Sequence, residues 1–287
     1  MEIIEDKDPW VFQVDSHIVQ TVYNTQNNYL ISYNQDCTDN KTCAIYFSSN
    51  DIYYPNAEDI FKKKIVDKNF FEWYGTRIKN VYKHIFLRDV HKQWYLSGIN
   101  KEISSPEELL KFLMRETIGY SITTIGSSAG GYAAVLYGSM LKAKKAIVFN
   151  AQFEINSLLD TSSSNVDPFI FKYRTLPVSE YYDIKPFINN DLDVFYFLSA
   201  GSDWDSEQHH HIKDVKSINV IRFNTKHHGI PFLKIAVEKV INLKSEKLRK
   251  YTNYTNNPIF FTIRMIGIIK TIKGAIQQLQ YKYKMKK

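Results

Sequence analysis

The sequence predicts an α/β fold, with one mainly parallel central sheet flanked by helices. Strand-like and helix-like segments alternate from about residue 42 to about residue 243, which is the pattern of a parallel sheet covered by helices. The 287 residues are 44% hydrophobic and 23% charged, so the chain has enough apolar material for a large core. No internal repeat or Gly/Ser linker divides the chain, and we expect one main domain over residues 1–250.

The expected strands are short apolar runs rich in β-branched and aromatic residues. They are, in order, 29–34, 42–48, 83–88, 120–126, 145–151, 192–201 and 218–225. The expected helices are 57–72, 103–119, 131–143, 206–216 and 230–243. Within 103–119, Ser104 or Ser105 can cap the helix, Pro106 suits its first turn and Gly119 ends it. The irregular residues 152–190 are expected to form a cap-like insertion or lid.

Three of the 11 glycines lie within six positions, in the stretch ITTIGSSAGGYAAVL at residues 122–136. Gly126 to Gly130 match G-x-S-x-G, and the match lies between an expected strand and an expected helix. In such a nucleophile elbow the serine, here Ser128, occupies a strained turn that leaves no room for side chains two residues away. The alternatives are a glycine-rich packing turn or a phosphate-binding turn. The latter is disfavoured, because neither G-x-G-x-x-G nor a following GK[ST] is present.

The stretch GSSAGGYAAVLYG, with these flanking elements, resembles the α/β-hydrolase superfamily over roughly residues 28–245. The shorter motifs FNAQ, D-x-x-Q and a late HG resemble hydrolase-like proteins of bacterial surface-polysaccharide biosynthesis loci. The resemblance implies an α/β-hydrolase fold and, through the polysaccharide loci, a carbohydrate substrate.

A nucleophilic serine needs a histidine base and an orienting carboxylate, and in this fold the chain order is Ser, acid, His. The acid should follow the next-to-last strand, and the histidine should follow the last one. The candidates are Asp203, Asp205 and Glu207 for the acid, and His227 and His228 for the base. We prefer His228, because Gly229 lets the loop carry its imidazole over the sheet. Asp205 is preferred because its D-x-x-Q spacing with Gln208 matches the resembling proteins. Asp203 is the rival, and a helix N-cap is the alternative role for either aspartate.

An acyl-transfer site also needs hydrogen-bond donors for the oxyanion. One is expected to be the backbone N–H of Ala129, and the other that of Ser48 or Ser49 in the loop FSSND. Gln152 and Tyr132 are expected to contact the substrate, with ordinary packing as the alternative for each.

We expect no metal site in this chain. Cys37 and Cys43 lack metal-ligand spacing, and the consecutive residues His209, His210 and His211 would point in different directions on a helix. The net charge of +7 is compatible with an anionic partner, but no nucleic-acid-binding motif is present and we expect no nucleic-acid partner.

The basic residues are concentrated in residues 242–287. Residues 251–287 are expected to form a tail, in which 257–287 have apolar residues at helical spacing and Lys and Arg on the other side. Such a helix can lie in a membrane interface, or it can dock on its own domain or on a partner. The N-terminus MEIIEDKDPW lacks the apolar stretch of a signal peptide, so we expect a cytoplasmic protein, with the tail as one route to the inner face of the membrane.

These observations predict an esterase or O-acetyltransferase that forms an acyl-enzyme on Ser128, with a small-molecule or glycan ester as substrate. Hydrolysis would need no cofactor, whereas transfer would use an acyl donor such as acetyl-CoA. The alternative is a non-catalytic hydrolase-fold binding or assembly factor of a glycan or secretion system.

Overall fold

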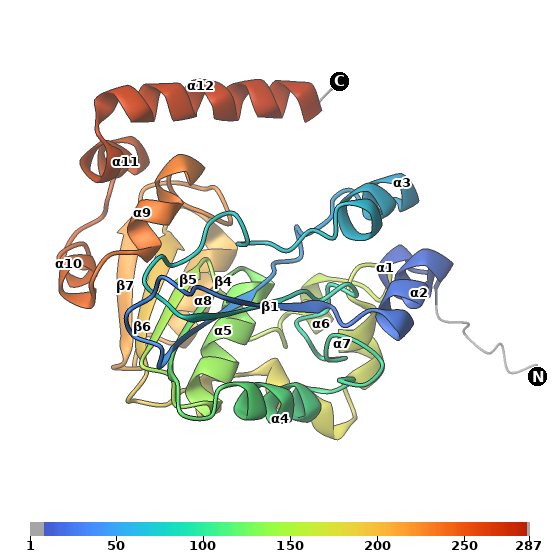
Figure 1. Ribbon diagram of the computed structural model, residues 1–287. Helices are drawn as coiled ribbons and strands as arrows, with labels where there is room; N and C mark the ends of the chain where they lie inside the picture. Colours follow the sequence, from blue (N-terminus) through green and yellow to red (C-terminus); the bar gives the residue numbers. More distant parts are fainter. Residues whose placement is uncertain (1–8, 286–287) are drawn as a thin grey trace, which may run out of the picture.

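The computed structural model describes residues 9–285, with side chains through residue 280, and these residues contain one seven-stranded sheet (Figure 1). The strands are β1 (Tyr29–Tyr33), β2 (Thr42–Phe47), β3 (Lys83–Leu87), β4 (Ser121–Ser127), β5 (Lys145–Phe149), β6 (Asp193–Ser199) and β7 (Ile218–Phe223). Their order across the sheet is β1-β3-β2-β4-β5-β6-β7. β1 pairs antiparallel with β3, and each other neighbouring pair is parallel. The expected α/β fold with a mainly parallel sheet is confirmed.

Helices cover both faces of the sheet (Figure 1). The helices and helical turns are α1 (Phe12–Asp15), α2 (His17–Thr25), α3 (Glu58–Phe61), η1 (Lys62–Asp67), α4 (Pro106–Glu116), α5 (Ala129–Met140), α6 (Leu158–Thr161), α7 (Pro168–Tyr173), η2 (Pro177–Tyr182), η3 (Lys185–Phe187), α8 (Asp203–His211), η4 (Lys234–Ala236), α9 (Val237–Ile241), α10 (Ser245–Arg249), α11 (Pro258–Ile266) and α12 (Ile268–Met285). One face packs against α4, α5 and buried residues of the 152–190 segment. The other packs against η4, α9, α10, α11 and the loop that precedes β3.

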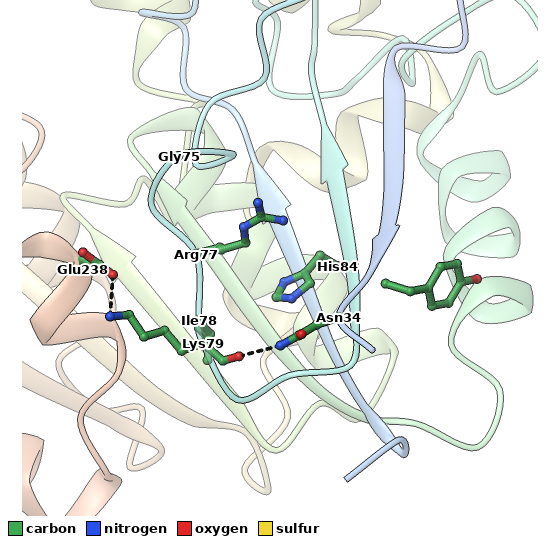
Figure 2. Close-up of a pocket in the computed structure, with 8 residues that line it drawn as sticks. Asn34, Gly75, Arg77, Ile78, Lys79, His84 and Glu238 are labelled. Carbon is green, nitrogen blue, oxygen red and sulfur yellow. Dashed lines mark hydrogen bonds and ion pairs between the residues drawn. The ribbon is translucent and has the colours of Figure 1, made fainter. Parts of the chain in front are cut away.

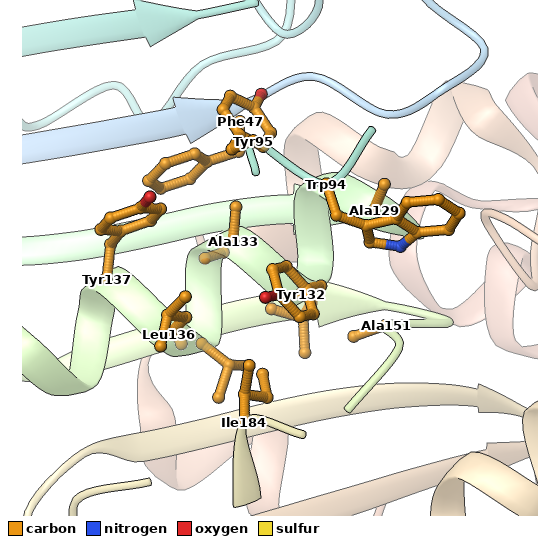
Figure 3. Close-up of a cluster of buried hydrophobic side chains, with 14 of the residues drawn as sticks. Phe47, Trp94, Tyr95, Ala129, Tyr132, Ala133, Leu136, Tyr137, Ala151 and Ile184 are labelled. Carbon is orange, nitrogen blue, oxygen red and sulfur yellow. The ribbon is translucent and has the colours of Figure 1, made fainter. Parts of the chain in front are cut away.

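The helix α5 is the centre of the core on its face of the sheet, as Figure 3 shows. Tyr137 stacks on Phe47 of β2 with ring centroids 5.6 Å apart. Residue Ile184, from the 152–190 segment, is fully buried in the same cluster. The segment therefore contributes to the hydrophobic core, and its role as a lid stays a prediction.

Several element boundaries differ from the sequence-based expectation. The helix expected over 230–243 is shorter, since residues 230–233 are irregular and regular helix begins only with η4 and α9. The short helices α1 and α2 near the N-terminus were not expected. The helix expected within 257–287 is divided into α11 and α12 at Gly267, where φ is 81°. Residues 1–8, in which no signal peptide was expected, and 286–287 of the tail lie outside the described residues.

The chain turns sharply where β4 meets α5. Ser128 has φ 53° and ψ −124°, outside the regions that residues other than glycine favour. Its N–H donates to the carbonyl of Phe149 at the end of β5 (2.9 Å), and its carbonyl accepts from the N–H of Tyr132 in α5 (3.0 Å). Neighbouring hydrogen bonds therefore hold Ser128 in a strained conformation.

Two glycines give the chain room for this turn. A Cβ on Gly126 would lie 1.9 Å from the carbonyl oxygen of Gly130, and a Cβ on Gly130 would lie 2.4 Å from that of Phe47. Both contacts involve backbone atoms, which cannot move aside as the end of a flexible side chain can. The glycines of the G-x-S-x-G match are therefore required by close backbone approach.

We expect Gly126→Ala to lower the free energy of unfolding by about 3 kcal/mol or to prevent folding, because its Cβ overlaps a carbonyl oxygen. Gly75→Ala is the matched control, since a Cβ there has no neighbour within 4 Å and should change stability by less than about 1 kcal/mol. Urea denaturation of both variants measures the difference. Equal stability of the two variants would contradict this account of the turn.

Candidate active site

The structure brings Ser128, His228 and Asp205 into one hydrogen-bonded chain. His228 Nε2 lies 2.9 Å from Ser128 Oγ, and His228 Nδ1 lies 2.8 Å from Asp205 Oδ1. With the proton on Nδ1 donated to the carboxylate, Nε2 has a free lone pair that accepts the serine hydroxyl proton. Ser128 directly follows β4, Asp205 lies in the first turn of α8 after β6, and His228 lies in the loop after β7, so all three are near the carboxyl edge of the parallel sheet.

The two aspartates on α8 have different surroundings. Asp205 is fully buried and faces His228, whereas Asp203 is exposed in the first turn of the helix. The N-cap is neither of them but Ser202, whose hydroxyl accepts from the N–H of Asp205. The geometry therefore favours Asp205 over Asp203 as the partner of the histidine.

The side chain of Trp204 was not singled out from the sequence, yet it packs on the histidine. Its ring stacks on the imidazole of His228, with centroids 5.2 Å apart and an interplanar angle of 30°. The side chain of His228 is still 34% exposed, so solvent or a substrate can reach it. Trp204 thus restricts the imidazole from one side and leaves another side open.

A buried asparagine holds the histidine loop in place. Asn150, directly after β5, donates from Nδ2 to the carbonyl of Gly229 (3.0 Å), to that of His227 (3.3 Å) and to Ser199 Oγ (2.7 Å). Its Oδ1 accepts from the N–H of Ser199 at the end of β6 (2.8 Å). Both residues that flank His228 are therefore tied to β5 and β6. The sequence feature that could have identified Asn150 is its position as a polar residue at the carboxyl end of a buried strand.

The second residue of the D-x-x-Q spacing holds the helix that carries Asp205. Gln208 is buried and accepts through Oε1 from the N–H groups of Phe153 (2.6 Å) and Glu154 (3.0 Å). Its Nε2 donates to the carbonyl of Glu154 (2.9 Å). Asp205 and Gln208 lie one turn apart on α8, so this attachment fixes the direction in which the carboxylate points.

Gln152 lies beside the serine, and its contact with a substrate stays a prediction. Its Nε2 donates to Ser128 Oγ (3.1 Å), and its Oε1 accepts from the indole N–H of Trp94 (3.2 Å). Because the indole can only donate, it fixes the orientation of the amide with the NH₂ group toward the serine. Trp94 was not identified from the sequence, because it belongs to no motif.

The loop that carries Trp94 is buried and unusually shaped. Lys92, Trp94 and Tyr95 all have positive φ, between 52° and 61°. The carboxylate of Asp89 accepts four backbone N–H bonds from the loop, at 2.8 to 3.1 Å. Burial raises the pKa of Asp89 to about 6, although these four donors favour the ionised form. The loop is therefore organised around one buried carboxyl group.

The backbone N–H groups expected to bind the oxyanion differ in whether they already have a hydrogen-bond acceptor. The N–H of Ala129 lies at the first position of α5, where it has no intrahelical acceptor. The N–H of Ser48 instead donates to the carbonyl of Leu87 (3.2 Å), because the β2–β3 ladder extends one residue beyond β2. The N–H of Ser49 donates to Glu72 Oε2 (2.7 Å), a carboxyl group whose pKa is raised by burial. The expectation that Ser48 or Ser49 offers a free N–H is therefore corrected for this conformation.

Tyr132 does not line the site, and this expectation is also corrected. Its side chain projects from α5 and is fully buried in the core (Figure 3). Its hydroxyl donates to the carbonyl of Tyr181. The residue follows the elbow by one helical turn, and its ring points into the hydrophobic layer. Tyr132 thus packs the elbow helix against the 152–190 segment.

The three consecutive histidines on α8 have separate partners. His209 Nε2 lies 3.1 Å from Arg222, His210 Nε2 lies 3.5 Å from Lys213, and His211 Nε2 lies 2.8 Å from Asp183. Among the described residues, no group of three or more His, Cys, Asp and Glu side chains is arranged to hold a metal ion.

A cleft of about 440 Å³ lies at the opposite, amino edge of the sheet (Figure 2). Its lining residues are Tyr33, Asn34, Gly75, Arg77, Ile78, Lys79, His84 and Glu238. Lys79 pairs with Glu238 (2.9 Å). Burial, with a further contribution from Arg77, lowers the pKa of His84 to about 4, so this imidazole is neutral at pH 7. The cleft is separate from the Ser128 site.

Comparisons with known proteins find similarity to solved structures alone, since no family model and no curated protein matches. The capsule O-acetyltransferase of Neisseria meningitidis serogroup A is 13% identical, with 68% of this chain and 81% of that chain covered and a TM-score of 0.47. The glycosylation-associated protein complex Gap123 from Streptococcus agalactiae is 15% identical, with 67% and 39% covered and a TM-score of 0.44. The carboxylesterase EstE1 from a metagenomic library is 12% identical, with 78% and 82% covered and a TM-score of 0.37. The chain itself, with its mainly parallel sheet, strand–serine–helix elbow and Ser–Asp–His order, has the α/β-hydrolase fold.

Proposed function

We propose that the protein is a serine-dependent acyl-transfer enzyme, an esterase or an O-acetyltransferase. The observation that carries this proposal is the hydrogen-bond chain from Ser128 through His228 to buried Asp205, at 2.9 Å and 2.8 Å. A base beside the hydroxyl and a carboxylate behind the base are what activates a serine near neutral pH. The strained backbone of Ser128 adds support, because residues with strained backbone conformations are concentrated at active sites.

The reaction proceeds in two steps that share one acyl-enzyme. Ser128 Oγ attacks the carbonyl carbon of an ester or thioester while its proton passes to His228 Nε2. The bond to the leaving group then breaks, that group takes the proton from His228, and the acyl group stays on Ser128. In the second step His228 removes a proton from water or an acceptor hydroxyl, whose oxygen attacks the acyl carbon. The bond between that carbon and Ser128 Oγ then breaks, Oγ takes the proton from His228, and the acid or the new ester leaves. Asp205 stabilises the imidazolium that forms in each step.

The oxyanion is proposed to be bound by the N–H of Ala129 and the side-chain amide of Gln152. The Ala129 N–H lies at the positive end of α5, directly after the nucleophile. The Gln152 amide donates to Ser128 Oγ at 3.1 Å and is held in that orientation by Trp94. It therefore replaces a second backbone donor, since the N–H groups of Ser48 and Ser49 already have acceptors.

The substrate is proposed to be a carbohydrate ester, or a carbohydrate hydroxyl that receives an acetyl group from acetyl-CoA. The support is the resemblance of the motifs FNAQ, D-x-x-Q and HG to proteins of surface-polysaccharide loci. Hydrolysis and transfer use the same three residues, so the triad is compatible with both.

We expect the triad to act as a unit in the hydrolysis of p-nitrophenyl acetate. Ser128→Ala and His228→Ala should each lower kcat by roughly 10⁴-fold or more, and the double variant should be no worse than either. Asp205→Asn should lower kcat roughly 10³- to 10⁴-fold, because the amide lacks the negative charge that stabilises the imidazolium and its NH₂ group can favour the wrong tautomer of the histidine. Asp203→Asn is the matched control and should change kcat less than about twofold, since Asp203 is exposed. A loss in Asp203→Asn that equals the loss in Asp205→Asn would contradict this assignment of the acid.

Gln152→Leu should lower kcat by roughly 10²-fold with little change in KM, because it removes a donor used mainly in the transition state. Trp94→Phe removes the indole N–H and keeps an aromatic ring, so it should cause a smaller loss in the same parameter. Thermal unfolding of both variants checks that the core is intact. If Gln152→Leu keeps more than about a third of kcat, the second oxyanion donor lies elsewhere.

The carbohydrate preference is tested with defined acyl donors and acceptors. Glucose pentaacetate should be hydrolysed with a kcat/KM at least about tenfold above that of butyl acetate, or acetyl-CoA should acetylate chitobiose, as detected by mass spectrometry. The wild type is compared with Ser128→Ala in both assays. Efficient hydrolysis of butyl acetate, with no activity on either sugar, would overturn the carbohydrate proposal and leave the acyl-transfer chemistry standing.

A further inference from the structure

The last helix, α12, lies outside the helices that cover the sheet, and one of its sides faces the protein. In Figure 1, α12 runs along the periphery of the molecule, beyond the helices that cover the sheet. Thr271 is buried, and a Cβ on Gly274 would lie 2.5 Å from Cγ2 of Ile235 in η4. The side of α12 that carries these two small residues therefore faces the protein. The other sides of the helix are presented to the surroundings.

One of these outer sides is apolar. Five large side chains of α12 are between 50% and 70% exposed: Ile268, Ile269, Ile272, Ile276 and Leu279. At 100° per residue they fall within an arc of roughly 100°, so they form one continuous stripe. Exposing an apolar stripe of this kind to water is unfavourable in free energy, and such stripes mark surfaces that bind a membrane or another molecule.

Cations adjoin the stripe, and anions are missing from the whole segment. Lys270 and Lys273 are exposed on the arc next to the stripe, and Arg264 is exposed on α11. The sequence from residue 247 to residue 287 contains ten Lys and Arg residues and no Asp or Glu. An electropositive border beside a hydrophobic stripe complements a surface with anionic headgroups above an apolar interior.

We infer that α12 docks in the plane of an anionic lipid surface, with the isoleucine stripe at the acyl boundary and the lysines at the phosphates. A second copy of the chain is a poorer occupant. Pairing two such stripes would bring the lysines of both copies together, with no acidic residue in either tail to neutralise them. Within residues 9–285 no helix has the length and apolarity to cross a bilayer, so the contact is interfacial. This inference does not depend on the chemistry at Ser128.

The test is co-sedimentation of the full-length protein with two kinds of vesicle, phosphatidylcholine alone and a mixture of phosphatidylcholine with phosphatidylglycerol. We expect strong binding to the mixed vesicles and weak binding to phosphatidylcholine alone. The two levels of binding should become similar as the salt concentration is raised. The double variant Ile269→Ser/Ile272→Ser should weaken partitioning by roughly 100-fold, because it removes apolar area from the stripe. Lys270→Gln/Lys273→Gln should weaken binding to the mixed vesicles roughly 20-fold at low salt.

The matched control for the apolar variant is Met114→Ser/Ile118→Ser, a pair at the end of α4 that is 54% and 77% exposed. It should bind vesicles like the wild type, and all variants should keep the wild-type thermal midpoint. Two outcomes overturn the inference. One is equal absence of binding to both vesicles by folded wild type. The other is a homodimer, seen by analytical ultracentrifugation, that the isoleucine variant dissolves while vesicle binding is absent.

Discussion

The strained backbone at Ser128 is the constraint on which the rest of the structure depends. A serine at φ 53° is stable only because the sheet holds it from several sides. Hydrogen bonds to Phe149 and from Tyr132 fix its two peptide groups, and the glycines at 126 and 130 let neighbouring backbone approach. The helix that follows is buried on all sides, so the turn cannot relax by tilting α5. The strained turn holds the Ser128 hydroxyl at the carboxyl edge of the sheet and at the start of a helix.

The other parts of the site are assembled by buried polar side chains rather than by hydrophobic packing. Asn150 ties the histidine loop to β5 and β6, and Gln208 ties α8 to the segment after β5. Trp94 orients Gln152, and its own loop is organised by the carboxyl of Asp89. Each of these groups is buried, and a buried polar group that loses its partner is costly. The network therefore specifies one arrangement around Ser128.

Much of the fold could be predicted from the sequence, because each strand is a short apolar run and each main helix has helical spacing. The elbow could be found because close backbone contacts at Gly126 and Gly130 leave a local glycine pattern. Asn150 and Trp94 could not be assigned roles, since their partners are distant in the sequence and leave no local pattern. The N–H groups of Ser48 and Ser49 are already hydrogen-bonded because of the strand register and the position of Glu72. No sequence motif indicates either feature. The tail is divided at Gly267 because the backbone there adopts a positive φ, which the helical spacing of apolar residues does not indicate.

The central claim, that Ser128 is an activated nucleophile, is tested most directly by intact-protein mass spectrometry after exposure to a fluorophosphonate. Such a reagent reacts with a serine whose hydroxyl is activated by a neighbouring base and leaves ordinary serines unmodified. The account predicts one adduct on the wild type and none on Ser128→Ala. Absence of an adduct on folded wild type, or an adduct that persists in Ser128→Ala, would contradict it.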